Sequence, residues 1–350
     1  MTFAPVQHPF ATAFPDGRWL GVSQDVRLTV ARLAAESPAD AAAWQEMLAE
    51  FPSLAPHIFA VLGSPASAPG LAKAGYGIWR KGGVDTLRRL GKLFLSSPRE
   101  MLDARFESSR VKAMLAVWGM HLDFAPDQAG GALFPYLETM ANQSFGMVLG
   151  QGGAETIVTA LTGMIEADGG AIECNAEVIE VLTDGTGAKG VRLADGRVVR
   201  AKRAVIGNVT PGALVARLLP KGSGNKGFDA GARAFRHAPG TMMLHLALDG
   251  LPDWAAGAEL KRFAYVHLAP SLQQMAQTYT EAVSGLLPRE PALVVGQPTA
   301  VDPSRAPAGK HVLWVQVRQV PGGCMCCAAG VPMQVALTTL LARERPDRLL

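Results

Sequence analysis

A glycine-rich turn at residues 150–155 is the first place where this sequence could do chemistry. An apolar run, residues 145–149, leads into Gly150-x-Gly152-x-x-Glu155, and an amphipathic stretch follows. A turn of this kind at a helix N-terminus binds the pyrophosphate of a dinucleotide through its backbone N–H groups. Glu155 replaces the third glycine of the pattern, and its carboxylate would repel a phosphate. The turn therefore favours a glycine-rich helix entry, and a nicotinamide dinucleotide site using Gly150 to Glu155 stays as an alternative.

The sequence contains neither a complete nucleophile motif of a hydrolase nor a complete set of metal ligands. Ser144 misses the G-x-S-x-G pattern of a hydrolase nucleophile by its first glycine. Cys324, Cys326 and Cys327 are crowded together without the second ligand pair of a zinc site, so we predict no metal. The seven histidines are scattered, and His245 falls in an apolar strand-like run, where a buried structural histidine is expected. The sequence assigns no catalytic residue.

The composition is that of a globular protein with ample core. Of 350 residues, 49% are hydrophobic and 18% are charged, and the formal net charge is +3. So small a basic excess gives no ground for nucleic-acid binding. No stretch approaches the roughly 20 apolar residues of a membrane span, and the first residues lack the pattern of a secretory signal. Clustered rather than spaced cysteines favour a reducing compartment, so we expect a cytoplasmic protein.

Residues 71–112 are locally basic and contain aromatic side chains. The basic residues are Lys73, Arg80, Lys81, Arg88, Arg89, Lys92, Arg99, Arg105, Arg110 and Lys112. Tyr76, Trp79 and Phe94 lie among them. An amphipathic basic surface of this kind can lie on an anionic membrane, and a solvated helical face is the other interpretation. Peripheral membrane contact through residues 71–112 is therefore a hypothesis.

Local patterns predict helices first and strands later. Asp16-Gly17 predicts a hairpin joining residues 10–14 to 18–22. Ser37 and Ser97 have N-cap positions, which predicts helices from 38 to about 62 and from 98 to about 121. A further helix is expected over residues 154–168. The expected strands cover residues 177–182, 190–193, 197–201, 204–207, 241–248 and 311–320. The result is a mixed α/β fold.

Four stretches, taken in order, resemble the phytoene-desaturase-related flavoproteins, especially the branch of pyridine nucleotide-disulfide oxidoreductase domain-containing protein 2. The stretches are residues 106–121, residues 152–181, residues 191–211, and Asp302-Pro303-Ser304-Arg305 with Gly309-Lys310-His311. The resemblance extends to about Gly323, and its last two stretches are the most specific.

The resemblance implies a two-domain flavoprotein with a discontinuous FAD domain and a substrate domain that carries a helical insertion. Residues 1–145 would be the hairpin and helical part of the substrate domain, 146–220 the returning segment of the FAD domain, and 221–323 further substrate-domain strands and helices. Val178, Gly207 and Asn208 match positions near the adenine end of the cofactor. The implied reaction is transfer of a hydride from a hydrophobic small molecule to FAD.

The resemblance also implies two segments that this sequence lacks. One is an initial strand with G-x-G-x-x-G, and the other is a final glycine-rich flavin segment, in whose place residues 324–350 form an anomalous tail. We therefore expect a truncated form that is inactive on its own. A non-catalytic remnant and a nicotinamide-binding protein remain the alternatives.

Overall fold

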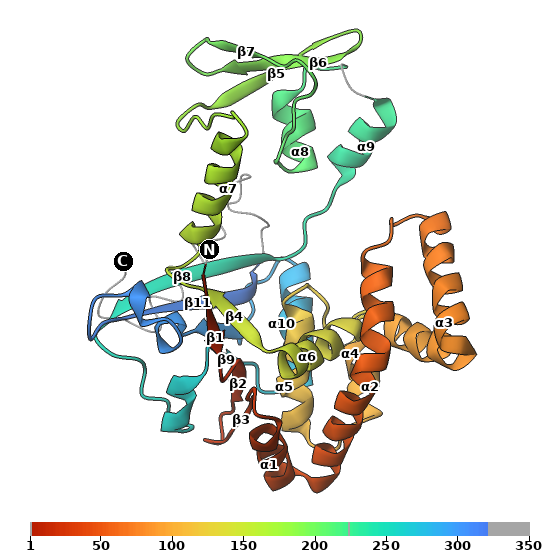
Figure 1. The fold of residues 1–350 in the computed structure, drawn as a ribbon, viewed down its shortest axis with the longest axis vertical. Coiled ribbons are helices and arrows are strands. Elements are labelled where there is room, and N and C mark those ends of the chain that lie inside the picture. Colours follow the sequence, from red (N-terminus) through yellow and green to blue (C-terminus); the bar gives the residue numbers. More distant parts are fainter. Residues whose placement is uncertain (1, 223–224, 321–350) are drawn as a thin grey trace. The chain divides into compact units, whose positions relative to one another are not determined.

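The computed structural model describes residues 2–222 and 225–320, which form two compact units (Figure 1). One unit comprises residues 2–157 and 239–320, and the other comprises residues 158–222 and 225–238. The combination of helices with several sheets confirms the predicted mixed α/β class. In the described residues, no helix is long and apolar enough to cross a membrane.

The first unit is built on a six-stranded sheet in the order β3-β2-β9-β10-β11-β8. Its strands are β2 (Phe10–Ala13), β3 (Trp19–Val22), β8 (Gly240–Leu248), β9 (Tyr265–Leu268), β10 (Leu293–Gly296) and β11 (His311–Val320). Only β2 and β9 pair in parallel. The hairpin predicted around Asp16 is confirmed, since Phe10 of β2 lies opposite Val22 of β3. A separate ribbon joins β1 (Phe3–Val6) to β4 (Met147–Gly150).

Helices cover one face of this sheet (Figure 1). They are α1 (Val26–Glu36), α2 (Pro38–Leu62), α3 (Ala68–Leu95), α4 (Pro98–Asp103), α5 (Ser109–Met120), α6 (Leu133–Phe145) and α10 (Leu272–Val283), with short 3₁₀ turns η2 (Ala258–Arg262), η3 (Pro298–Ala300) and η4 (Pro303–Arg305). The predicted caps are confirmed, because Ser37 accepts the N–H of Asp40, and Ser97 forms a capping box with Glu100. A positive φ at Gly83 bends α3 sharply.

The single helix predicted over residues 98–121 is wrong, because the chain turns between α4 and α5. The cause is Asp40 of α2, whose carboxylate is fully buried. It accepts the backbone N–H of Glu107 at 2.6 Å and that of Ser108 at 2.9 Å, and the Ser108 hydroxyl in turn caps α5. A residue almost 70 positions away therefore fixes this helix start, which no local pattern could indicate.

Replacing Asp40 with asparagine is expected to lower the free energy of unfolding by about 2 kcal/mol, because one of the two N–H groups bound by the buried carboxylate loses its acceptor. Chemical denaturation measures the loss. The matched control is Asp85→Asn, since Asp85 is exposed on α3 and forms no salt bridge in the described part of the chain. Equal stabilities for the two variants would contradict this account of the α5 start.

Two apolar clusters lie on opposite faces of the sheet. Because successive strand residues point to opposite faces, Phe10 joins the larger cluster with α2, α5, α6 and α10, and Ala11 joins the smaller one. The smaller cluster contains Phe263, Val266 and Leu313. In α5 every residue except Ser109, Arg110 and Lys112 is buried, so α5 is the central helix of the larger core rather than a helix with one apolar stripe.

The second unit contains a three-stranded antiparallel sheet and four helical segments. Its elements are α7 (Glu155–Ala167), which begins in the first unit, β5 (Val178–Asp184), β6 (Gly187–Leu193), β7 (Val198–Arg200), α8 (Pro211–Ala213), the π-helical η1 (Leu214–Leu218) and α9 (Lys226–Ala234). The strand predicted over residues 204–207 is wrong. That segment pairs with no described strand and leads instead to Thr210, whose side chain caps α8.

Candidate functional site

Three consecutive backbone N–H groups of the glycine turn before α7 are already bonded. Gln151 donates to the carbonyl of Thr2 at 3.0 Å, and Gly153 donates to the carbonyl of Gly150 at 3.2 Å. The N–H of Gly152 donates to the carboxylate of Asp302 at 2.7 Å. A dinucleotide turn needs free N–H groups to bind a pyrophosphate. The turn at residues 150–155 therefore does not fit one.

Asp302 and Arg305 of the proline-rich loop fix this turn. The Asp302 carboxylate is almost fully buried and also accepts hydrogen bonds from Ser304 and Arg305, while the Arg305 guanidinium donates to the Gly150 carbonyl at 2.6 Å. Burial alone would raise the pKa of Asp302, but its hydrogen bonds with Ser304, Gly152 and Arg305 keep that pKa below its usual value. An ionised carboxylate thus occupies the place where a phosphate would have to sit.

Removing the charge of Glu155 is expected to leave nicotinamide dinucleotide affinity unchanged within about twofold, since no N–H group is released by the change. Titration of Glu155→Gln with a reduced nicotinamide dinucleotide, followed by fluorescence, measures this. Glu166→Gln, at the other end of α7, is the control. A tenfold gain confined to Glu155→Gln would restore the nicotinamide alternative.

The three cofactor candidates lie in the second unit. Val178 begins β5 opposite Leu193, and Gly207 and Asn208 lie in the exposed segment before α8. A Cβ added to Gly207 would contact Leu214 of η1, and β5 also contacts η1, so the candidates adjoin one π-helical segment. Val178 is 36% exposed and Ile206 is 92% exposed. Such apolar surface beside accessible backbone fits a planar ring such as adenine, but it supplies no group that would bind a pyrophosphate.

The structure brings together two histidines that the sequence left scattered. The Nε2 atoms of His121 and His267 are 3.2 Å apart, although 146 positions separate them in the chain. Burial lowers the pKa of His267 to about 3, and positive Arg318 acts in the same direction. Trp118 stacks on His121 at 4.8 Å between ring centroids. Local sequence patterns cannot indicate a contact between residues this far apart in the chain.

The remaining sequence candidates are not part of a site. His245 is exposed on the edge strand β8, so its predicted burial is wrong; β8 pairs with β11 alone and presents His245 on an uncovered part of the sheet. Ser144 lies on the helix α6 and not on a strand-to-helix elbow. No cluster of metal-ligating side chains occurs in residues 2–222 and 225–320. Cys324, Cys326 and Cys327, like the predicted tail at 324–350, lie outside the described residues.

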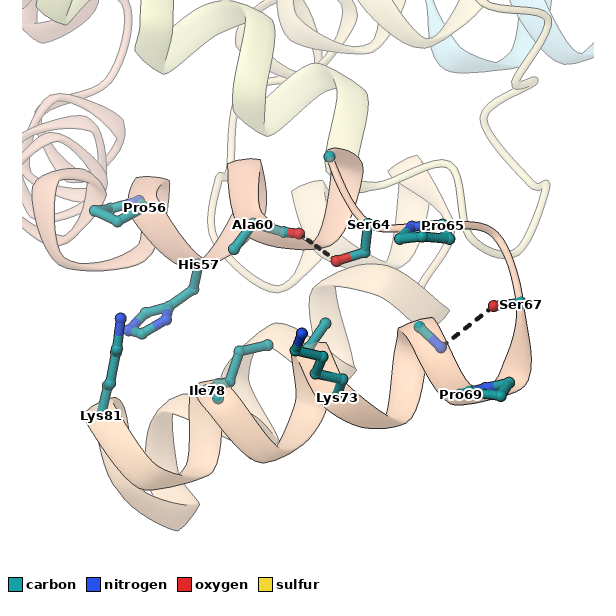
Figure 2. Close-up of a pocket in the computed structure, with 14 residues that line it drawn as sticks. Pro56, His57, Ala60, Ser64, Pro65, Ser67, Pro69, Lys73, Ile78 and Lys81 are labelled. Atoms are coloured by element: carbon teal, nitrogen blue, oxygen red, sulfur yellow. Dashed lines mark hydrogen bonds between the residues drawn. The ribbon is translucent and has the colours of Figure 1, made fainter.

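A pocket lies between α2 and α3 in the first unit (Figure 2). Its volume is about 620 Å³, and Pro56, His57, Ala60, Lys73, Ile78 and Lys81 are among its lining residues. Ligand pockets commonly have volumes in this range. His57 and Lys81 point toward one another from the two helices, and Ser64, Pro65 and Ser67 surround the opposite end (Figure 2).

Comparison with known proteins identifies relatives over most of the chain. A phytoene desaturase (neurosporene-forming) of Cereibacter sphaeroides is 25% identical over 317 residues, which covers 89% of this chain and 57% of that enzyme. The chain is a relative of the phytoene desaturases. Mouse pyridine nucleotide-disulfide oxidoreductase domain-containing protein 2 is 24% identical over 235 residues, covering 63% of this chain and 40% of the mouse protein. No protein-family model matches.

The chain also resembles one solved structure over almost its whole length and a zinc chaperone over a short segment. An oxidoreductase from Methanosarcina mazei has a TM-score of 0.51 at 16% identity, over 99% of this chain and 68% of that structure, so the two chains share a fold, in agreement with the predicted mixed α/β class. The zinc chaperone YeiR of Escherichia coli is 62% identical over 34 residues, which is 10% of this chain and 10% of YeiR. The desaturase relative spans just over half the length of the Cereibacter enzyme.

Proposed function

We propose that this chain is part of an FAD-dependent oxidoreductase that takes a hydride from a C–H bond of a hydrophobic small molecule. The observation that carries the proposal is the 25% identity to a phytoene desaturase, which extends over 89% of the chain. Two further desaturases, from Myxococcus xanthus and a Methylomonas species, match at 26% and 25% identity. Phytoene is a hydrocarbon, so a related site would bind its substrate by apolar contact and by excluding water.

In this proposal the second unit contributes the adenine end of the cofactor site. When bound, FAD supplies a two-electron acceptor for the hydride. The chain's own part is to position the adenine through Val178, Gly207 and Asn208. No residue of the chain is assigned as a base. The turn at Gly152 cannot contribute a pyrophosphate site, because Asp302 occupies it, so we expect the chain alone to retain no FAD and to be inactive.

The test restores the part of the Cereibacter desaturase that the chain does not match. A chimera carrying those segments is expected to purify with bound flavin and to bleach when phytoene is added without oxygen. Val178→Asp in the chimera should weaken FAD binding about tenfold, which is the cost of a desolvated charge at a contact. Val199→Asp is the matched control, because Val199 is also an exposed strand valine of the same sheet. A folded chimera without flavin would overturn the proposal.

We further infer that α3 provides the membrane contact within residues 71–112. Arg89 and Arg105 pair with Glu50, Arg99 with Asp127, Arg110 with Asp16 and Glu36, and Lys112 with Asp103. The other basic residues of the range, all on α3, form no salt bridge in the described part of the chain: Lys73, Arg80, Lys81, Arg88 and Lys92. Unpaired cations beside exposed Tyr76 and Trp79 favour an anionic bilayer surface.

Flotation with lipid vesicles tests this contact. The chain is expected to float with phosphatidylglycerol vesicles at low salt, to be released at high salt, and to ignore neutral phosphatidylcholine vesicles. Failure to float with either kind of vesicle would overturn the inference without touching the proposed flavin chemistry.

A second candidate function is zinc binding by Cys324, Cys326 and Cys327. Two observations favour it: a segment of 34 residues is 62% identical to a zinc chaperone, and three of the four cysteines of the chain fall within four positions. Cysteine thiolates are strong zinc ligands, and three of them leave one coordination position for another ligand. This proposal replaces the prediction that the chain binds no metal and that its tail is only an anomaly.

Competition with a coloured chelator tests zinc binding. The reduced chain is expected to take one zinc ion from the chelator, and the triple variant C324S/C326S/C327S to take none. Cys174→Ser is the control, since Cys174 is exposed and lies in the second unit. Equal zinc uptake by all three proteins would end this proposal.

A further inference from the structure

We propose that the pocket between α2 and α3 binds one anionic phospholipid of a membrane, with an acyl chain inside the pocket and the phosphate between Lys73 and Lys81. The inference rests on the membrane contact proposed for α3 and specifies its ligand. It does not depend on the flavin chemistry.

The pocket has the size and lining that an acyl chain needs. Its volume is about 620 Å³, and its walls are formed by short apolar residues, among them Ala60 and Ala74, and by the buried side chain of Ile78. Gly77 also lines it, and a Cβ added at Gly77 would meet no atom within 4 Å. The space beside Gly77 is therefore not filled by other side chains.

Two ammonium groups flank this apolar space without a carboxylate to neutralise them. Lys73 and Lys81 both line the pocket, and within the described residues neither forms a salt bridge or a hydrogen bond. In Figure 2 Lys73 and Lys81 project from the side of α3 that faces α2, and His57 of α2 points toward Lys81. The hydroxyl of Ser64 is engaged with the Ala60 carbonyl at 2.6 Å, so the lysines are the free donors. Lysine ammonium groups bind phosphate by charge and hydrogen bonding.

The surroundings of the pocket favour a membrane lipid over a soluble anion. Tyr76 and Trp79 are 58% and 48% exposed and form an aromatic pair with ring centroids 5.7 Å apart. On α2, Phe59 and Leu62 are about half exposed. Large amphipathic rings prefer the level of lipid headgroups, and exposed aliphatic side chains prefer the acyl layer below. A helix pair with this surface places the mouth of the pocket where phosphates and chains are both available.

The first experiment fills the pocket without changing any charge. Gly77→Leu is expected to weaken binding of monomeric dihexanoyl-phosphatidylglycerol at least about tenfold, since the new side chain takes the space of an acyl chain. Gly75→Leu is the matched control, because Gly75 lies on the same helix, has equally open space, and does not line the pocket. Circular dichroism shows whether each variant keeps its helices. Equal lipid affinity for the two variants would overturn the proposal.

The second experiment compares two double variants that each lose two positive charges, one among the pocket-lining residues and the other outside them. K73Q/K81Q is expected to lose affinity for the short-chain lipid by about fivefold per lysine, and R80Q/R88Q to retain it, since Arg80 and Arg88 do not line the pocket. Both variants should float less with anionic vesicles, because both lose the same charge. Inorganic phosphate alone should not compete at millimolar concentration. If phosphate competes, or if the two variants lose equal affinity for the short-chain lipid, the lipid binds to a diffuse basic surface and the pocket proposal is wrong.

Discussion

Lowering the pH from about 7 to about 5 is expected to destabilise the first unit by about 3 to 4 kcal/mol, because His121 and His267 are buried as neutral rings. With their Nε2 atoms 3.2 Å apart, one ring donates a proton to the other, and a second proton would remove the acceptor. Burial lowers the pKa of both rings, to about 3 for His267, and the nearby Arg318 guanidinium opposes protonation of each.

The direction of the effect follows from where the protons bind. In the unfolded chain both histidines take up protons below about pH 6.5, and in the folded protein they do not. Stability is therefore fully present above that pH and is lost progressively as the pH falls from there toward the folded-state pKa, which is about 3 for His267. Asp302 also has a lowered pKa, so its contribution is lost only in a lower window, below about pH 4.

Urea unfolding between about pH 8 and about pH 4.5, followed by tryptophan fluorescence, measures the expected loss. His267→Gln should reduce the slope by about one proton, because one buried ring with a lowered pKa is gone, whereas His121 and His8 still titrate. The glutamine amide can still donate to His121. His245→Gln is the control, since His245 is exposed on the edge strand β8. An unchanged slope in His267→Gln would show that the histidine pair is not the origin of the acid sensitivity.

Local elements were predictable wherever the determinant lies within a few residues. The Asp16-Gly17 turn fixes the β2–β3 hairpin, and the Ser97–Glu100 capping box starts α4, both as predicted. The helix boundary at Ser108 was not predictable, because the side chain that satisfies its backbone, Asp40, belongs to another helix. The same holds for the histidine pair, which exists only because α5 packs on β9 through Trp118.

Hydrophobic periodicity predicted the helix α7 correctly, but it does not say whether the apolar face of that helix is covered. Ile157, Val158, Leu161, Met164 and Ile165 have the spacing of an apolar helix face, which normally packs against a core. In the described residues α7 buries none of its side chains, and these five are 44% to 65% exposed. The pattern identifies an apolar helix face, but it does not identify the part of the protein that would pack against that face. The cofactor candidates have the same limit, since Val178 and Gly207 were taken from a resemblance and not from a local pattern.

Strand alternation predicted which residues of β11 would be buried on one face, but not what would happen on the other. The alternation of Leu313, Val315 and Val317 with polar neighbours predicted a strand with one apolar face, and Leu313 and Val317 are indeed buried. The same alternation gave no warning that Arg318 on the other face would also be buried, at 9% exposure. That face is covered by α10, whose position depends on contacts far along the chain.

Replacing Gly296 with alanine is expected to lower the free energy of unfolding by about 3 kcal/mol, the cost of overfilling a packed site. Gly296 of β10 lies between Tyr265 of β9 and Trp314 of β11, directly opposite each. The two rings meet over it, with centroids 5.3 Å apart, and a Cβ at this position would overlap the indole of Trp314. Three paired strands fix the backbone here, so the ring cannot move away without losing its contact with Tyr265.

A double-mutant cycle separates this overlap from a general cost of alanine in the strand. In the Trp314→Leu background the indole is absent, so adding Gly296→Ala should cost less than about 1 kcal/mol, which leaves a coupling of about 2 kcal/mol. The control is Gly75→Ala, where the added methyl group meets open space on a helix and should be neutral or slightly stabilising. If Gly296→Ala costs the same with and without the indole, the glycine is required by its backbone and not by Trp314. The close approach of the ring to β10 would then not be what excludes a side chain there.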